Sequence, residues 1–352
     1  MSVTVHQRPG VYSAYDASSV TRGRGHGGVV GLVGVNPKAQ TGVVQIFTSY
    51  EKAVTALGIE GEESMAELIR LALRNGASAV AAVALKSGDQ YESGFAALEQ
   101  LEEISVVICD STDQKVQQTL RDSVERASRV RRERIAVAAC ARGADVETCI
   151  LRAKALNHER VVLTAPGCGC PSGQTMSGLY GAAAVAGAIA GETDPAVPLG
   201  GAELKGLTGV DRQFTDAELD RLILGGVTVI EHLGGVVSVV RGVTTRTTTG
   251  GEADPTWREL TTIRIVDDVI PGLRQALRTR FRRAKNTARS REAIRAQVVL
   301  ELEHKLEREI ITGYENVAVT ADPQDPTRCL VDFSFTAAHG LNQIWLTAHI
   351  AV

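Results

Sequence analysis

Short apolar strands alternate with amphipathic helices through the first half of the chain, and this alternation constrains the fold most. The runs ISVVICD, RIAVAAC and RVVLTAP each follow a helical segment that has one apolar face. Strands that are apolar on both faces are typical of a parallel sheet covered by helices on each side. The sequence therefore predicts an α/β core with a doubly wound, mostly parallel sheet.

The alternation ends after the small-residue helical segment SGLYGAAAVAGAIAGE. A long irregular stretch with two prolines follows, and then a helix in which Thr215 and Glu218 have the spacing of a capping box. The next two apolar runs are separated by Gly234-Gly235, which predicts a hairpin. These segments connect the α/β core to the last third of the chain.

The last third of the chain predicts an α+β domain. We expect residues 260–266, LTTIRIV, to form a strand that leads into a helix from Asp267 to about Ala288. A second long helix follows, and the remaining segments ENVAVTAD, RCLVDFSFTAA and the C-terminal run are predicted strands.

Both ends of the chain carry alternating segments. The segment SVTVHQRPGVY is typical of a short strand that stops at Pro9-Gly10. In the final segment, LNQIWLTAHIAV, every second residue from Ile344 to Val352 is apolar, which is the period of a half-buried strand. An unpaired apolar strand promotes association. The pattern leaves open whether each strand pairs with its own chain or with another.

Composition excludes few functional classes. The 352 residues suffice for two or three domains at ~100–200 residues each. A net charge of −3 and an apolar content of 44% are ordinary and indicate no particular partner. No apolar run reaches the ~18 residues that a membrane span needs, and the N-terminus lacks a signal-peptide pattern. The six cysteines form no C-x-x-C pair, so we expect a reduced, cytosolic protein.

The segment GRGHGG at residues 23–28 satisfies the dinucleotide-binding pattern G-x-G-x-x-G. That pattern needs a strand before the glycines and a helix after them. Here a polar segment precedes and a predicted strand follows, so we interpret residues 17–28 as a flexible linker. No phosphate-binding G-x-x-x-x-G-K-[ST] motif occurs.

The segment APGCGCPSG at residues 165–173 follows a predicted parallel strand, where α/β proteins place their ligands. Cys168 and Cys170 suggest a metal or redox site, but no nearby histidine or further cysteine completes a tetrahedral ligand set. We interpret the segment as a tight turn. We therefore expect no catalytic, cofactor-binding or metal-binding residues, and not an enzyme.

The predicted helix 267–289 carries a basic stripe of Arg274, Arg278, Arg282 and Lys285, spaced by three or four residues. Acidic residues are absent from Val269 to Arg291, so ion pairs within the helix are few. Three interpretations remain open: a solvated face, a nucleic-acid-binding surface, and a surface that docks on an acidic protein.

Several segments, in this order and spacing, resemble the contractile tail sheath family of phage tails and phage-tail-like bacteriocins. RPGVY is similar to the start of that family, and GAAAVAGAIAGETDPAVPLGGAELKGL to its Ala/Gly helix and the loop after it. GVTVIEHLGGVVSVVRGVTT and WRELTTIRIVDDVI resemble the run into its C-terminal domain, and LVDFSFTAAHGLNQIWLTAHIAV its closing strands. The resemblance covers nearly the whole chain.

The resemblance implies that both terminal arms leave the subunit and add strands to neighbouring subunits. It implies these parts: an N-terminal β-arm (1–16), a linker (17–28), an α/β core region (29–250), an α+β C-terminal domain (251–338) and a C-terminal β-arm (339–352). The exchanged arms would contact neighbours through apolar residues of both ends: Val3, Val5, Val11, Tyr12, Ile344, Leu346, Ala348 and Ile350.

The resemblance also implies a function. Subunits would polymerise as stacked six-fold rings or a helical tube around an inner tail tube protein, and would contact baseplate and tail terminator proteins. The sheath would contract from a metastable extended state and drive the tube through a target envelope. Arg274, Arg278, Arg282 and Lys285 would contact the tube. No cofactor, nucleic acid or membrane span is expected.

Such a protein would be assembled in the bacterial cytoplasm, as part of a phage tail or of a released phage-tail-like particle. Two alternatives stay open. One is an α/β nucleotide- or metabolite-binding enzyme whose site uses APGCGCPSG, and the other is a nucleic-acid-binding protein that uses the basic helix 267–289.

Overall fold

Runs of Val, Ile, Leu and Ala form the interior strands of one large sheet, because both of their faces are covered. The computed structural model describes residues 28–59, 63–171 and 175–342. Its largest sheet has the order β10-β9-β6-β5-β4-β1-β3-β2. The strands are β1 (Val29–Val35), β2 (Val44–Phe47), β3 (Ala79–Leu85), β4 (Ile104–Cys109), β5 (Ile135–Ala139), β6 (Val161–Ala165), β9 (Thr228–Leu233) and β10 (Val236–Val239).

Neighbouring strands from β9 through to β3 pair in parallel, and an antiparallel strand closes each side of the sheet. β2 pairs antiparallel with β3, and β10 pairs antiparallel with β9 through a hairpin at Gly234-Gly235. The mostly parallel central sheet and the hairpin agree with the sequence-based predictions.

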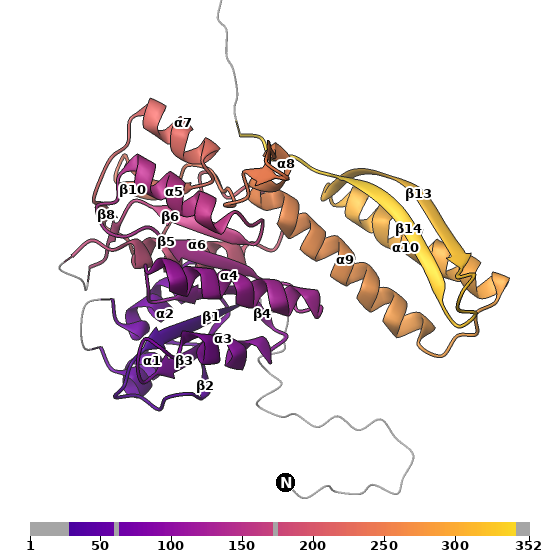
Figure 1. Cartoon of the computed structure of the whole chain (residues 1–352), viewed down its shortest axis with the longest axis horizontal. Helices are drawn as coiled ribbons and strands as arrows, with labels where there is room; N and C mark the ends of the chain where they lie inside the picture. The colour runs from indigo at the N-terminus through magenta and orange to yellow at the C-terminus, as the bar shows by residue number, and fades with distance from the viewer. Residues whose placement is uncertain (1–27, 60–62, 172–174, 343–352) are drawn as a thin grey trace, which may run out of the picture.

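Helices cover both faces of the sheet (Figure 1). On one face lie α1 (Tyr50–Leu57), α2 (Met65–Arg74) and α6 (Gly178–Gly191). On the other lie α3 (Tyr91–Glu99), α4 (Gln114–Arg129), α5 (Val146–Leu156) and α7 (Asp216–Leu224). The doubly wound arrangement is therefore confirmed.

Polar side chains fix where several of these helices begin. Asp113 accepts hydrogen bonds from the backbone N–H groups of the first turn of α4, and Asp145 does the same for α5. Thr215 and Glu218 form the expected reciprocal capping box at the start of α7. Each cap satisfies N–H groups that would otherwise lack acceptors.

The small-residue helix α6 packs closely on α2. A Cβ atom added at Gly187 would clash with the carbonyl oxygen of Ala72, and one added at Gly191 would lie 2.7 Å from the Cα of Gly76. The absence of side chains here lets the two helix backbones approach, and it explains why the segment is rich in Gly and Ala.

Five minor elements complete the connections: β7 (Cys168–Gly169), β8 (Gly209–Val210), β11 (Thr248–Thr249), β12 (Glu252–Ala253) and α8 (Pro255–Arg258). β7 pairs with β8, and β11 pairs with β12. The segment from β11 to α8 thus contains a short hairpin and one helical turn.

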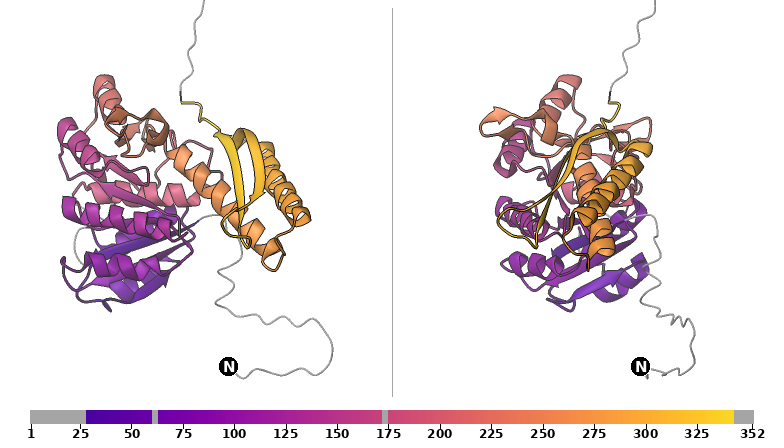
Figure 2. Two further views of the ribbon diagram at one scale, coloured as in Figure 1. Left: turned by 45° about the vertical axis from the view of Figure 1, so that its right-hand side comes forward. Right: turned by 90° about the vertical axis from the view of Figure 1, so that its right-hand side faces the viewer.

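The C-terminal region is an α+β unit beside the large sheet (Figure 2). It consists of α9 (Leu260–Phe281), α10 (Ala288–Glu307), β13 (Ile311–Ala321) and β14 (Cys329–Ala337). The predicted strand 260–266 is wrong, because these residues form the first turns of α9. The predicted extension of this helix to about Ala288 is also wrong, since α9 ends at Phe281 and Thr287 caps a new helix.

Helix α9 connects two hydrophobic cores. Leu260 and Ile263 pack into the core between the sheet and α6, whereas Val269 and Leu273 pack with α10 and β13. Figure 1 shows α9 running from the α/β layer to the end of the C-terminal unit. Among the described residues, no helix is long and apolar enough to cross a membrane.

Candidate assembly surfaces

The β13–β14 ribbon is the first candidate surface. Its two antiparallel strands pair from Ile311 opposite Ala337 to Ala321 opposite Cys329. Val331, Phe333 and Phe335 of β14 pack against the core that α9 and α10 form, while the residues between them face solvent. Within the described ranges, the outer edge of each strand pairs with no other strand.

The residues predicted to exchange strands lie outside the described residues. This holds for all eight: Val3, Val5, Val11, Tyr12, Ile344, Leu346, Ala348 and Ile350. The structure therefore describes the ribbon edges to which such strands could add, but it does not describe the terminal segments.

The basic stripe of Arg274, Arg278, Arg282 and Lys285 is the second candidate surface, and its members have different surroundings. Arg274 donates a hydrogen bond to Glu133, in the turn before β5, at 2.8 Å. Arg278, Arg282 and Lys285 are exposed. The first member of the stripe therefore contacts the α/β core, whereas the last two lie at the corner between α9 and α10.

This corner is held against the β13–β14 turn. The Asn286 side chain donates to the carbonyl oxygens of Pro326 and Arg328, at 2.8 and 3.2 Å. Arg328 in turn forms an ion pair with Asp322 at 2.7 Å. The exposed end of the basic stripe and the tip of the ribbon thus form one rigid end of the C-terminal unit.

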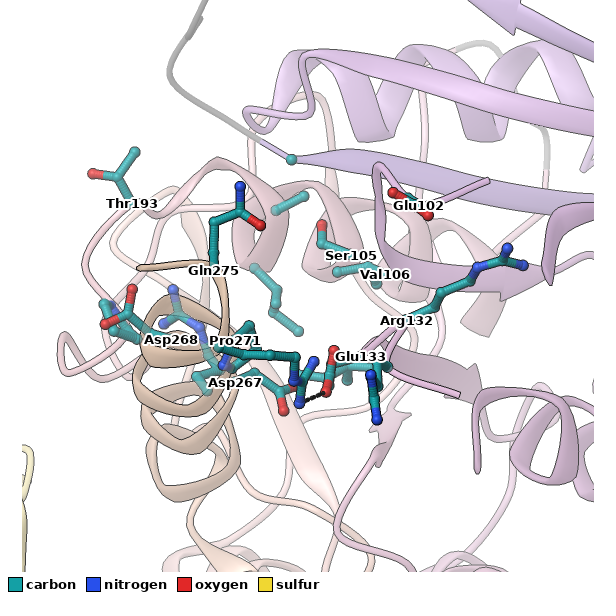
Figure 3. A pocket seen from close by; sticks show the side chains of 18 of the residues that line it. Glu102, Ser105, Val106, Arg132, Glu133, Thr193, Asp267, Asp268, Pro271 and Gln275 are labelled. Atoms are coloured by element: carbon teal, nitrogen blue, oxygen red, sulfur yellow. Dashed lines mark hydrogen bonds and ion pairs between the residues drawn. The ribbon is translucent and has the colours of Figure 1, made fainter. Parts of the chain in front are cut away.

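A cleft of about 1180 Å³ separates α9 from the amino-terminal side of the sheet (Figure 3). Glu102, Ser105 and Glu133 line it from the α/β core, and Asp267 and Asp268 line it from α9. We call this space the α9 cleft.

Ion pairs span the base of the α9 cleft. Arg160 forms a bidentate pair with Asp267, at 2.7 and 2.9 Å. Burial raises the pKa of the Asp267 carboxyl above its ordinary value, although Arg160 opposes this shift. Burial also acts to raise the pKa of Glu133, but the hydrogen bond and charge of Arg274, a backbone hydrogen bond and the charge of Arg160 together hold that pKa below its ordinary value.

Arg264 anchors the beginning of α9 in a different way. Its guanidinium donates to the carbonyl oxygens of Glu192, Asp194 and Val197, at 2.8 to 3.3 Å. Burial lowers the pKa of this side chain. Since the loop after α6 supplies all three acceptors, α9 is fixed to both α6 and the sheet.

The cysteine segment lies at the carboxyl end of β6, as the sequence predicts. Cys168 is fully buried, and burial raises the pKa of its thiol. The Cys170 thiol lies 2.6 Å from Glu67 Oε1 and is also buried. Because its pKa is raised, the buried Cys168 thiol is a poor nucleophile and a poor metal ligand. Among the described residues, no three His, Cys, Asp or Glu side chains are grouped to hold a metal ion.

The crossover direction of the sheet reverses between β1 and β4, which is where ligands bind in many α/β proteins. Here the carboxylate of Asp110 lies between the two strand ends. It accepts hydrogen bonds from the Tyr91 hydroxyl at 2.5 Å and from the Val35 N–H at 2.7 Å. Asp110 therefore joins the end of β1 to the start of α3 at the position where many α/β proteins bind a ligand.

Sequence reasoning missed the α9 cleft. Glu133 and Arg160 each stand directly before the buried strand region, and Asp267 lies seven residues into α9. A charged residue just before an apolar strand marks the rim of a sheet. The pattern could have indicated a charged rim, but not which helix crosses it.

Comparison with known proteins identifies the family. Residues 85–245 match the family described as phage tail sheath protein central domain, and residues 252–351 match the phage tail sheath C-terminal domain. The tail sheath protein of Bacillus phage SP01 is 29% identical over 214 residues, which cover 59% of this chain. The match spans 36% of that relative, so the chain corresponds to about a third of its length.

Solved structures share the fold. A sheath tail protein from Desulfitobacterium hafniense has a TM-score of 0.70 at 13% identity, covering 93% of this chain and 100% of that one. The helical sheath of the anti-feeding prophage in its contracted state has a TM-score of 0.73 at 16% identity, covering 98% and 99%. The two family matches and this shared fold lead to one conclusion: the chain belongs to the phage tail sheath family.

Proposed function

We propose that this protein is the structural subunit of a contractile sheath, which polymerises around an inner tube and shortens to drive the tube forward. The β13–β14 ribbon carries the proposal. A two-stranded ribbon offers two outer edges, and the chain has two alternating terminal segments outside its described part. Strand addition to exposed edges is an established mode of association.

Strand addition suits this ribbon for a physical reason. Two strands alone are marginally stable, and packing on α9 and α10 covers only one face of this ribbon. Added strands would satisfy backbone N–H and C=O groups along both edges and extend the apolar face of Val331, Phe333 and Phe335. We propose that the two arms of neighbouring subunits, residues 1–16 and 339–352, occupy these edges, with residues 17–28 as the tether.

We propose further that the inner tube contacts the corner between α9 and α10. Arg282 and Lys285 are exposed there, Arg278 lies one turn before them, and Arg274 stays in its ion pair with Glu133. Exposed charge pairs are weak and screened by salt. Such contacts could be broken and left behind as the sheath changes its diameter.

Electron micrographs of the purified protein test the sheath proposal. The intact chain should form rings or tubes, and deletion of residues 1–16 should leave a folded single subunit, because residues from Val29 to Ala337 in the described part of the chain already form three hydrophobic cores. A matched variant that keeps the length but replaces Val3, Val5 and Val11 by Ser separates loss of the strand from loss of length. Normal tubes from both variants would overturn strand addition by this arm.

The two alternative functions give different outcomes. A metabolite-binding enzyme would remain a small oligomer in every micrograph. A nucleic-acid-binding protein would bind DNA with an affinity that falls steeply as salt rises.

A further inference from the structure

The described chain begins inside the α9 cleft, at Gly28. The Gly28 N–H donates to the carbonyl oxygen of Ala190 at 2.6 Å, and its own carbonyl accepts from the Ser78 N–H at 3.1 Å. A Cβ atom added at Gly28 would clash with the Ser105 hydroxyl. These contacts fix Gly28 in the wall of the cleft.

Two carboxylates beside this point form no ion pair with any described cation. Glu102 is exposed in the turn before β4, three residues from Ser105. Glu192 follows the end of α6, two residues after Ala190, and its Oε1 accepts only the N–H of Asp194, at 3.0 Å. Figure 3 shows Glu102 on the same side of the cleft as Ser105.

The other acids that line the cleft are neutralised. They pair as Glu133 with Arg274, Asp267 with Arg160, and Asp268 with Lys305. Arg131, Arg132, Arg264 and Arg278 also line the cleft, and the buried Arg264 interacts electrostatically with Glu192. Among the described residues, Glu102 and Glu192 are thus the lining carboxylates that no cation contacts in a direct ion pair.

The segment that precedes Gly28 has the opposite charge. Residues 17–27 read ASSVTRGRGHG and contain Arg22 and Arg24 but no acid. Arg24 is four residues from Gly28, which corresponds to at most ~14 Å of extended chain, so its side chain can reach either carboxylate. Gly23, Gly25 and Gly27 alternate with the larger residues of this segment, and a glycine lets a backbone lie close to a wall.

We propose that the α9 cleft binds residues 22–27 of the same chain, with Arg22 and Arg24 paired to Glu192 and Glu102. Each pair is weak when exposed, but the covalent connection at Gly28 makes the contact intramolecular and raises the effective concentration. The bound segment aims the N-terminal arm along α9 as it leaves the subunit. This holds for a single subunit and does not depend on the proposed assembly.

Limited trypsin digestion of the full chain tests the proposal, because trypsin cuts after Arg22 and Arg24. The protein is kept dilute enough to elute as single subunits from a sizing column. The variant Glu102→Gln/Glu192→Gln should be cut roughly three- to tenfold faster at these two bonds than the unchanged protein. The matched control is Glu103→Gln/Glu203→Gln, which removes two exposed acids that do not line the cleft. It should be cut at the unchanged rate.

Salt gives a second readout. Raising the salt to about 0.5 M should bring the unchanged protein close to the rate of the cleft variant, because exposed charge pairs are screened. Equal cleavage rates of all three proteins at low salt would overturn the proposal.

A cross-link gives a position-specific answer. In the variant Arg24→Lys, a carbodiimide should join the introduced amine to Glu102 or Glu192 within one chain, and mass spectrometry locates the amide. Cross-links spread over exposed acids elsewhere would also overturn the proposal. Neither result bears on whether sheaths form, so failure here is distinguishable from failure of the proposed function.

Discussion

Arg160 and Asp267 face each other with two parallel hydrogen bonds, so that the residue before β6 is joined to the middle of α9. Seven residues beyond Asp267, about two helical turns, Arg274 reaches Glu133 before β5. The C-terminal unit is thus attached to the amino-terminal rim of the sheet at two points along one helix. This attachment sets the orientation in which the ribbon and the basic corner are presented.

The Arg274–Glu133 pair should make stability depend on pH. Arg274 helps to hold the folded-state pKa of Glu133 below the ordinary value of 4.5. The pair therefore stabilises the protein fully at pH values above 4.5. The stabilisation is lost as the pH falls through the folded-state pKa. We expect Arg274→Met to lower the free energy of unfolding by up to about 1 kcal/mol at pH 7, and by less as the pH falls below 4.5. Urea unfolding at several pH values measures this, and a difference that does not vary with pH would contradict it.

Two glycine substitutions should change stability in opposite directions. Gly187→Ala adds a Cβ against the carbonyl oxygen of Ala72 and should destabilise the protein by about 1–3 kcal/mol. Gly272→Ala lies in the interior of α9 with only the Lys305 side chain at 3.8 Å, so it should stabilise by about 0.5–1 kcal/mol. Thermal unfolding of the pair gives the signs. A Gly187→Ala protein at least as stable as the unchanged protein would contradict the close approach of α2 and α6.

Asp110 should contribute to stability and not to ligand binding. Asp110→Ala leaves the Tyr91 hydroxyl and the Val35 N–H without their acceptor and should cost about 1–3 kcal/mol. The exposed control Asp216→Ala should stay within about 0.5 kcal/mol. Denaturant unfolding compares the two. An Asp110→Ala protein as stable as the control would show that these hydrogen bonds contribute little.

Thiol labelling should separate one cysteine from the others. Cys329 in β14 is partly exposed, whereas the remaining five are buried. Burial raises the pKa of Cys109 to about 12, which further suppresses its thiolate. A chromogenic disulfide should react quickly with one thiol in the native single subunit and with six in denaturant. Fast reaction at Cys168 or Cys170 would contradict their structural role.

Reversal of the basic corner tests the proposed tube contact. Arg282→Glu/Lys285→Glu should leave the fold intact, because both side chains are exposed. Extended sheath on its tube should no longer form, while sheath without tube should still form. The control Arg142→Glu/Lys154→Glu reverses two exposed charges of the α/β core and should assemble on the tube. Normal extended sheath from the corner variant, seen in micrographs, would exclude this contact.

The sequence predicted the sheet and its covering helices because each strand from β3 to β6 is buried on both faces and reads as an uninterrupted apolar run. It failed at residues 260–266, where Thr, Ile and Val favour a strand. Arg264 and Leu260 anchor this segment to the α/β core as a helix, and tertiary contacts outweigh the local preference.

The candidate surfaces were only partly predictable for a related reason. Helical spacing placed Arg274 in one stripe with Lys285, but spacing along a helix does not give the partners around it. Glu133, the partner of Arg274, is 141 residues away in the sequence. The long-range fold decides which charges of the stripe are used internally and which remain exposed.

Because α9 contributes side chains to two hydrophobic cores, it connects the α/β layer rigidly to the C-terminal unit. Its 22 residues correspond to about 33 Å of helix, in which Pro271 removes one backbone hydrogen bond. No loop separates the two cores along α9. We expect a force on the helices of the α/β layer to be transmitted through α9 to the ribbon and the basic corner. We therefore expect the α/β layer, the ribbon and the basic corner to turn together when either end of α9 is rotated.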